Sequence, residues 1–211
     1  MKRIFFVMLV LATQAHAEVT YERLRNAARD TNNWLTYSGT YRSERFSALD
    51  QVNTDNVDDL KVIWAYQMQP AINAGNGLVE TTPIVVDGIM YITEPPSTVT
   101  ALDTRSGKLI WTWSPDMPAE VKHIGFPRVN RGVAVLDDAV YVGTLDARLV
   151  SLDAATGAVR WDVEVADNHI GFSLTLAPLA LDGKIIVGVS GAEAGVRGFI
   201  AVSYTHLRAH E

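Results

Sequence analysis

Hydrophobic and polar residues between positions 143 and 161 follow a pattern that predicts a β-hairpin. Residues 148–152 (RLVSL) have the alternation of a half-buried strand, residues 153–157 (DAATG) supply turn residues, and residues 158–161 (AVRW) begin a second strand. The same pattern, A/S-L-D-x-x-S/T-G-x-x-x-W, occurs at residues 101–111 and again at residues 151–161. Two copies of one hairpin indicate an internal repeat.

An acidic turn between two apolar strands also recurs, with its aspartate at Asp87, Asp137 and Asp182, so the spacings are 50 and 45 residues. Four short strands in a period of roughly 40 to 50 residues correspond to one β-propeller blade. A helical solenoid is excluded because this region has no helical periodicity. We therefore predict an all-β fold, a β-propeller truncated to about three four-stranded blades over residues 61–202.

A short helix is predicted in the lead-in segment, residues 18–60, which precedes the blades. Thr20 is a candidate N-cap, and Leu24, Ala27 and Ala28 would share one helical face.

Two further elements are expected between the helix and the first acidic turn. Thr54 is placed to cap a single helical turn that carries Val57 and Leu60. Residues 61–68 follow as a strand, and we expect it to be the outer strand that closes a ring by pairing with the last blade.

The first 17 residues have the features of a secretory signal peptide. Lys2 and Arg3 precede an apolar run at residues 4–12, and residues 15–17 (AHA) form a small-residue cleavage pattern. The apolar run is too short to span a bilayer as a helix, and an uncleaved N-terminal anchor is the alternative. This pattern predicts export to the periplasm, where a chain without cysteine forms no disulfide.

Charge and hydropathy exclude two classes of partner. The formal net charge is −6, with 18 basic against 24 acidic residues, so the chain lacks the basic field that nucleic acid requires. After residue 17 no apolar stretch is long enough to span a membrane as a helix. A small molecule or a protein remains as the expected partner.

Beyond the repeat, the chain contains six short segments of distinctive sequence: residues 34–39 (WLTYSG), 45–49 (RFSAL), 51–53 (QVN), 80–83 (ETTP), 129–132 (VNRG) and 190–198 (SGAEAGVRG). In this order and spacing they resemble the N-terminal part of the quinoprotein alcohol dehydrogenases. These enzymes, of the methanol and ethanol type, use pyrroloquinoline quinone (PQQ) and a bound cation. The resemblance covers about residues 30–202.

The resemblance implies a periplasmic enzyme that oxidises primary alcohols with PQQ and Ca²⁺, with a lanthanide as the alternative cation. In that family PQQ lies on the axis of a propeller of about eight blades. The cation polarises a quinone carbonyl, an aspartate takes the alcohol proton, and a hydride passes to the quinone. A c-type cytochrome is the implied electron acceptor.

Glu80 and Arg131 are the first candidate site residues. By resemblance Glu80 contacts PQQ and Arg131 pairs with the PQQ carboxylates, for which a guanidinium fork is well suited. From the residues alone, Glu80 could equally be a solvated loop acid and Arg131 part of a salt bridge at a blade edge.

The other candidate residues lie in the third repeat. Thr175 matches a threonine that hydrogen-bonds the cofactor, although an ordinary strand threonine would look the same. Ser190, Gly191 and Ala192 lie where a strand ends, and small residues there let the backbone approach a flat ring system. Glu193 matches the metal-ligating glutamate, although composition alone would make it a turn acid. Ca²⁺ takes about six to eight oxygens, so PQQ and later residues must supply the rest.

Two segments depart from the family pattern. Many members carry adjacent cysteines, joined over the PQQ face, where this chain has Gly125 and Phe126. Phe126 either stacks on the cofactor or is a core aromatic. Residues 203–211 (SYTHLRAHE) fit neither the repeat nor the family and resemble translated adapter sequence, so His206 and His210 are not interpreted as a metal pair.

The resemblance places the asparagine metal ligand and the catalytic aspartate beyond Val202, so no catalytic base is assigned. His123 and His169 match no catalytic position and are interpreted as structural or surface residues. The chain by itself is therefore expected to be inactive. Its unpaired edge strands are expected to promote aggregation.

A second function, from a different class, is a non-enzymatic envelope scaffold built from the same repeat, like the outer-membrane assembly lipoproteins. Such proteins share the hairpin because its tryptophan packs between blades whatever the protein does. They usually carry a lipobox cysteine, and this chain has no cysteine. They also have no use for Glu80, Arg131 and Glu193 together, which favours the enzyme.

Overall fold

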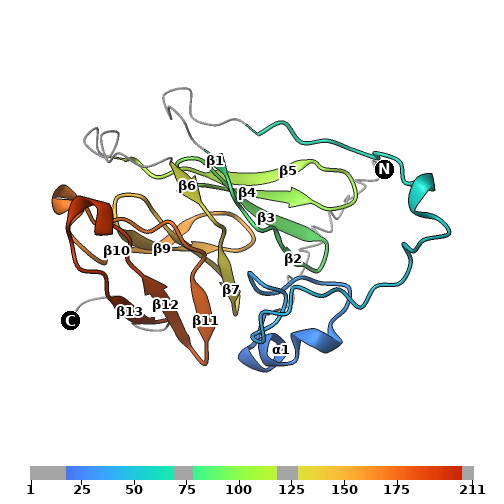
Figure 1. Ribbon diagram of the computed structural model, residues 1–211, viewed down its shortest axis with the longest axis horizontal. Coiled ribbons are helices and arrows are strands. Elements are labelled where there is room, and N and C mark those ends of the chain that lie inside the picture. The colour runs from blue at the N-terminus through green and yellow to red at the C-terminus, as the bar shows by residue number, and fades with distance from the viewer. Residues whose placement is uncertain (1–17, 69–77, 118–127, 206–211) are drawn as a thin grey trace, which may run out of the picture.

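The computed structural model describes residues 18–68, 78–117 and 128–205. Figure 1 shows their strands gathered in neighbouring antiparallel sheets, with the N-terminal helix below the first of them. The predicted signal peptide lies outside the described residues, as do His123, Phe126, His206 and His210.

Two complete blades have the same strand order. In the first, β2 (Ile84–Val86), β3 (Ile89–Glu94), β4 (Thr98–Asp103) and β5 (Leu109–Trp113) follow one another across the sheet. In the second, the strands are β7 (Ala134–Leu136), β8 (Ala139–Gly143), β9 (Arg148–Asp153) and β10 (Val159–Glu164). The predicted hairpins therefore form, with strands one to three residues longer or shorter than the sequence pattern suggested.

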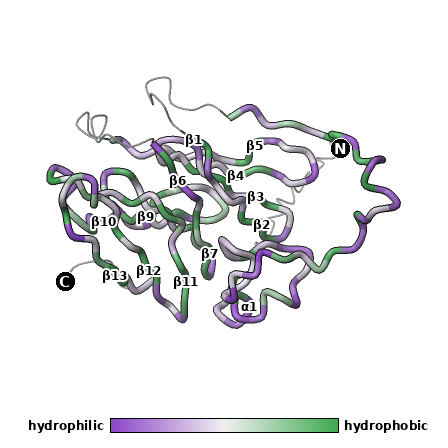
Figure 2. Tube along the Cα trace, viewed as in Figure 1, coloured by the Kyte–Doolittle hydropathy of each residue, from purple (hydrophilic) through white to green (hydrophobic). Residues whose placement is uncertain are grey.

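The third blade shows three strands within the described residues: β11 (Leu179–Leu181), β12 (Lys184–Gly188) and β13 (Ile200–Tyr204). The prediction of an all-β propeller with about three blades is confirmed. Hydrophobic residues concentrate along the blade strands in Figure 2, whereas the segment around the N-terminal helix is largely hydrophilic. Residues such as Val99, Val140, Leu152 and Ile185 are fully buried and form one contiguous core.

The acidic turns have the geometry that their residues suggest. Asp87, Asp137 and Asp182 have φ angles of 48°, 55° and 48°. Aspartate tolerates this left-handed region better than most residues, and such turns match the twist of the flanking strands. The periodic aspartates therefore specify where each blade turns from its first strand to its second.

Tryptophans join successive blades. The Trp111 indole donates from Nε1 to the Ala154 carbonyl at 3.0 Å and lies flat over Gly157, where an added Cβ would be 2.6 Å from the ring. Trp64 makes the same contact one blade earlier, with Nε1 3.0 Å from the Thr104 carbonyl and its ring over Gly107. The repeated glycine is required because its turn is the platform for the preceding tryptophan.

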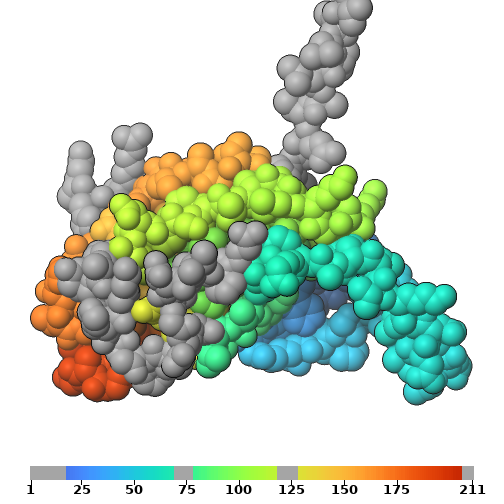
Figure 3. Space-filling model, turned by 90° about the horizontal axis from the view of Figure 1, so that it is seen from above, coloured from blue at the N-terminus to red at the C-terminus, as the bar shows by residue number. Residues whose placement is uncertain are grey.

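The strand predicted at residues 61–68 is not formed. Trp64 is nevertheless in the position of an outer-strand tryptophan, so the segment lies where the predicted outer strand would lie. Val62 and Ile63 are 87% and 81% exposed, and no described strand pairs with them. Figure 3 shows this segment, in teal, running along the first blade, whereas the part of the chain before it, in cyan, extends away from the blades. The prediction was wrong because local sequence specifies an extended backbone, whereas a strand also needs a partner.

The N-terminal helix α1 (Tyr21–Arg25) begins as predicted, with the Thr20 hydroxyl accepting from the Arg23 N–H at 3.2 Å. It continues into the 3-10 helix η1 (Ala27–Arg29), so Leu24 and Ala27 are buried but Ala28 is exposed. The change of helical pitch turns Ala28 out of the predicted face.

The second predicted turn forms as the 3-10 helix η2 (Val57–Asp59), but Thr54 does not cap it. Its N-cap position is held by Asn56, which makes no side-chain capping bond. Val57 and Leu60 are 46% and 62% exposed, so no apolar surface packs against this turn.

The segment from Ser203 onward shows no structural break at its start. Ser203 and Tyr204 continue β13, and the Thr205 N–H donates to the Gly183 carbonyl at 2.9 Å. Thr104 makes the equivalent bond to Gly88 in the first blade, also at 2.9 Å. The domain boundary at residue 203 stays a prediction.

Candidate functional site

A short parallel pair of strands brings the first two candidate residues together. β1 (Leu78–Val79) pairs with β6 (Val129–Asn130), so that Val79 lies opposite Asn130. The residues that follow are Glu80 and Arg131, and the Arg131 Nη2 lies 2.8 Å from the Glu80 Oε2. This pairing between distant segments was not predicted from the sequence.

Arg131 also reaches the third repeat. Its Nη1 donates to the Thr175 Oγ1 at 3.1 Å and to the Thr175 carbonyl at 3.2 Å, and its backbone N–H donates to the same carbonyl at 3.1 Å. The Thr175 hydroxyl in turn lies 3.4 Å from the Ser190 Oγ. Four candidate residues therefore form one hydrogen-bonded network, which we call the site network: Glu80, Arg131, Thr175 and Ser190.

Ser190 is anchored by a residue that the sequence analysis did not single out. Ser173 forms an isolated β-bridge with Ser190, and their hydroxyls lie 3.0 Å apart. Ser190 Oγ also donates to the Ser173 carbonyl at 3.0 Å. Ser173 precedes the predicted threonine by two residues, and its only signal in the sequence is that both lie on the same face of an extended segment.

Gly191 has a backbone conformation that a larger residue cannot adopt. Its φ is 134°, and an added Cβ would lie 2.3 Å from the Gly171 carbonyl oxygen. Ala192 then begins the 3-10 helix η5 (Ala192–Ala194), which contains Glu193 in its first turn. The tight turn therefore follows directly on the bridge between Ser173 and Ser190, and the approach of a flat ring system to these small residues stays a prediction.

Glu193 is exposed, and among the described residues it forms no hydrogen bond or ion pair with the site network. Among the described residues, no group of three or more histidines, cysteines, aspartates or glutamates is placed to hold a metal ion. The described part of the chain thus holds no complete coordination shell for a cation.

The donor set fits an anionic, oxygen-rich cofactor. The side chains of Arg131 and Glu80 are 39% and 37% exposed, so a ligand can reach the network. A guanidinium and two hydroxyls are suitable groups for carboxylates and carbonyls. Gly191 is buried, and the space that a side chain would need there is filled by the Gly171 carbonyl and Val196, so this glycine fixes the backbone beside Ser190.

Two other features lie apart from the network. A cavity of about 440 Å³ between the lead-in segment and strands β7 and β11 has Tyr37, Tyr41 and Leu179 among its lining residues, and no candidate site residue lines it. His169, in the 3-10 helix η4 (Asn168–Ile170), is exposed, consistent with a surface role. No helix in the described ranges has the length and apolar character needed to cross a membrane.

The fold and the network together define a propeller domain with a cluster of partly exposed polar side chains that three repeats contribute. Residues 34–193 match the family described as the β-propeller domain of glucose, ethanol and alcohol dehydrogenases, the PQQ family. The chain belongs to this family.

Its relatives in sequence include two bacterial dehydrogenases. The chain is 42% identical over 192 residues to a quinohemoprotein alcohol dehydrogenase of Pseudomonas putida, a match that covers 90% of this chain and 26% of that protein. It is 44% identical over 169 residues to the 1-butanol dehydrogenase (cytochrome c) of Thauera butanivorans, with coverage of 79% and 24%. The chain thus spans about a quarter of the length of these curated relatives.

Solved structures agree. A quinohemoprotein alcohol dehydrogenase from Pseudomonas putida HK5 superposes with a TM-score of 0.85 at 39% identity, over 92% of this chain and 28% of that one. A europium-containing methanol dehydrogenase superposes with a TM-score of 0.79 at 31% identity, over 89% and 32%. The propeller architecture is therefore shared with enzymes of known structure.

Proposed function

We propose that the protein takes part in the PQQ-dependent oxidation of primary alcohols. The observation that carries this proposal is the site network, in which residues from three separate repeats converge on Arg131. A structural propeller gains little from such a network at its surface, because exposed ion pairs contribute only about 0–1 kcal/mol to stability. Membership of the PQQ family favours the enzyme over the scaffold.

Each residue of the network has a role in this proposal. Arg131 binds PQQ carboxylates, and Glu80 and Thr175 orient its guanidinium by the contacts at 2.8 and 3.1 Å. The Thr175 hydroxyl donates to a cofactor oxygen, and the Ser190 hydroxyl, whose proton goes to the Ser173 carbonyl, contacts the cofactor as an acceptor. PQQ supplies the hydride acceptor. No described residue is assigned as the base that takes the alcohol proton.

Glu193 is proposed as one ligand of the cation that accompanies PQQ. A carboxylate oxygen suits Ca²⁺, and the remaining ligands come from the cofactor and from further protein residues. One structural relative is a europium-containing enzyme, which supports a lanthanide as the alternative cation.

The proposed setting is the periplasm, because of the signal-peptide pattern in residues 1–17. The proposed partners are a small alcohol as substrate and a c-type cytochrome as electron acceptor. The cytochrome is supported by the name of the Thauera relative, 1-butanol dehydrogenase (cytochrome c).

The direct test is a titration of the chain with PQQ, with and without Ca²⁺, followed by quenching of tryptophan fluorescence. We expect binding that Ca²⁺ strengthens, and Glu193→Gln is expected to abolish the Ca²⁺ effect because a neutral amide is a weaker ligand. Glu164→Gln is the control, since Glu164 is an exposed glutamate of β10, away from the network. A Ca²⁺ effect that survives Glu193→Gln would contradict the assigned ligand.

Activity needs a second experiment. The gene is sequenced across the codon for Val202, and the protein that it encodes is expressed. That protein is then assayed for alcohol-dependent dye reduction with PQQ and Ca²⁺. Activity that disappears in Glu193→Gln supports the proposal. A full protein that binds no PQQ rejects the enzyme and leaves the scaffold.

A further inference from the structure

Asn130 is a buried polar residue directly before Arg131, with 2% of its surface exposed. Its Nδ2 donates to the Gly143 carbonyl at 2.7 Å, and its Oδ1 accepts from the Gly132 N–H at 3.1 Å. Its own carbonyl accepts from the Thr93 hydroxyl at 3.1 Å. Asn130 is thus tied to the first blade through Thr93 and to the second blade through Gly143.

The bond from Gly132 to the Asn130 side chain encloses Arg131 in a tight turn. A side-chain oxygen that accepts from the N–H two residues on forms an Asx-turn, which fixes the backbone of the residue between. Gly132 completes the turn with a φ of 128°, where an added Cβ would lie 3.1 Å from the Thr82 carbonyl. The residue so enclosed is Arg131.

The backbone of Arg131 is held on both sides as well. Its N–H donates to the Thr175 carbonyl and its carbonyl accepts from the Thr82 N–H, each at 3.1 Å. With the backbone fixed in this way, the side chain leaves in one direction, and that direction leads to Glu80 and Thr175. The aim of the guanidinium therefore depends on the turn.

We propose that Asn130 is the positioning residue for Arg131: its Oδ1 closes the turn that aims the guanidinium at Glu80, at Thr175 and at a bound anionic cofactor. The cofactor part of this inference rests on the proposed function. The turn itself is independent of it, and the two are tested separately.

The test compares Asn130→Ser with Asn130→Ala in the whole chain. Both remove the amide donor from the Gly143 carbonyl, but a serine hydroxyl can accept from the N–H two residues on, whereas alanine cannot. The difference between these two variants therefore isolates the turn. Asn168→Ala is the matched control, because the Asn168 amide also donates to two backbone carbonyls, at 3.1 and 2.9 Å, outside this turn.

The first readout needs no cofactor. In a chain labelled with ¹⁵N-arginine, the guanidinium resonance of Arg131 is assigned by its loss in Arg131→Lys. We expect it to stay at its native position in Asn130→Ser and Asn168→Ala, and to move to the position of a freely solvated arginine in Asn130→Ala. Gly132→Ala, which disturbs the turn from its other end, is expected to move it in the same way and carries the test if Asn130→Ala does not fold.

The second readout is the affinity for PQQ. We expect Asn130→Ala to bind at least about tenfold more weakly than the native chain, and Asn130→Ser to stay within about threefold of it. Two results would overturn the inference. The first is an Arg131 resonance at the same position in Asn130→Ser and Asn130→Ala. The second is an equal affinity of these two variants for PQQ, when the native chain binds PQQ. If the resonance separates the variants but the native chain binds no PQQ, the positioning role stands and the proposed function fails.

Discussion

Arg131 and Glu80 form an ion pair whose side chains are about as exposed as those of another ion pair in the chain. Arg148 and Asp162 lie 2.7 Å apart with side chains 34% and 38% exposed, close to the values for the first pair. Surface pairs of this kind contribute about 0–1 kcal/mol to stability. The difference is that Arg131 also donates to Thr175, which supports the proposed role of Arg131 in binding the cofactor.

Arg131→Lys tests this difference. We expect a change in unfolding free energy below about 1 kcal/mol, because the pair is half-exposed. We expect PQQ to bind at least about tenfold more weakly, since an ammonium cannot reproduce the planar fork that contacts Glu80 and Thr175 together. Tryptophan quenching measures the affinity, with Arg148→Lys as the control. Equal affinities in the two variants would show that Arg131 is only a structural ion pair.

Asp137 provides a pH-dependent prediction. Burial, followed by the charges of Glu18 and Asp138, raises the pKa of its carboxyl above the ordinary value. Because the folded pKa is raised, the native state gains stability as the pH falls through that pKa, and the full gain is present below the unfolded pKa of about 3.9. At neutral pH the ionised carboxylate therefore opposes folding.

Asp137→Asn should stabilise the chain at pH 7, by up to about 0.5 kcal/mol at this half-buried position, and the gain should vanish near pH 4. Asparagine also tolerates the φ of 55° found there. Asp182→Asn is the control, because its carboxylate lies 3.6 Å from the Lys184 ammonium instead of near other acids. Urea unfolding at several pH values measures both. A gain that persists at pH 4 would contradict this explanation.

The candidate residues themselves could be predicted from the sequence, but their contacts could not. Glu80 and Arg131 meet through a two-residue parallel pairing of β1 and β6, which is too short to leave a periodic pattern. Ser173 and Asn130 were not assigned for a related reason: a serine and an asparagine are common in turns and strands alike. Their roles depend on which distant carbonyls they face, and only the fold specifies that.

At the scale of elements, the contact between tryptophan and glycine joins one blade to the next. Gly157 and Gly183 have similar φ angles, 73° and 69°. They differ in surroundings, since an added Cβ would lie 2.6 Å from the Trp111 ring at Gly157 but 4.0 Å from its nearest neighbour at Gly183. Alanine substitutions at the two glycines therefore separate the free-energy cost of a left-handed backbone from that of disturbing the packing between blades.

Gly183→Ala is expected to lose about 1–2 kcal/mol of unfolding free energy, the cost of a left-handed backbone with a Cβ. Gly157→Ala should lose that amount and about 1–3 kcal/mol more, because Trp111 must move away from its platform. Chemical denaturation measures both, and the near-ultraviolet circular dichroism of the indole should change only in Gly157→Ala. Equal losses would mean that the tryptophan contact contributes nothing.

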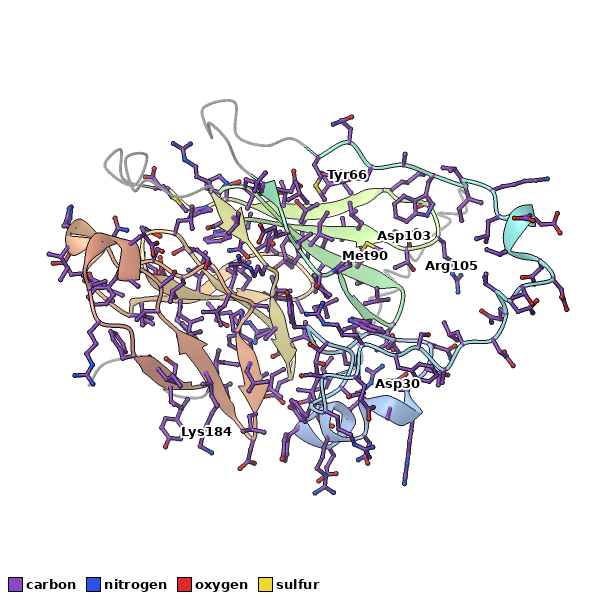
Figure 4. All side chains as sticks on the ribbon, viewed as in Figure 1. Asp30, Tyr66, Met90, Asp103, Arg105 and Lys184 are labelled. Carbon is purple, nitrogen blue, oxygen red and sulfur yellow. The ribbon has the colours of Figure 1, made fainter. Side chains whose placement is uncertain are left out.

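The same contact explains which elements could be predicted. Turns at Asp87, Asp137 and Asp182, and the hairpins that end in tryptophan, are specified by residues close together in sequence, so their pattern was sufficient. Residues 61–68 keep the tryptophan and its contact but form no strand. In Figure 4, Tyr66 of this segment lies beside the first blade, where its hydroxyl donates to the buried Glu94 carboxylate at 3.1 Å.

At the scale of the whole molecule, the third blade has three described strands, so that β13 lacks the outer neighbour that β4 and β9 have in the two complete blades. β13 pairs with β12 alone among the described strands, and Ile200, Val202 and Tyr204 are 73%, 50% and 45% exposed along it. An open, apolar edge strand offers unpaired N–H and C=O groups to another chain. We therefore expect this chain to associate in solution as its concentration rises.

Val202→Lys should suppress that association, because a charge on an edge strand disfavours pairing with a second chain. Leu109→Lys is the matched control. Leu109 is 52% exposed on β5, the outer strand of a complete blade, so this substitution adds the same charge away from β13. Sedimentation velocity over a range of concentrations measures the outcome. If both lysines reduce association equally, net charge and not the β13 edge governs it. If neither does, the contact between chains lies elsewhere, and the exposed side chains of Val62 and Ile63 become the surface to vary next.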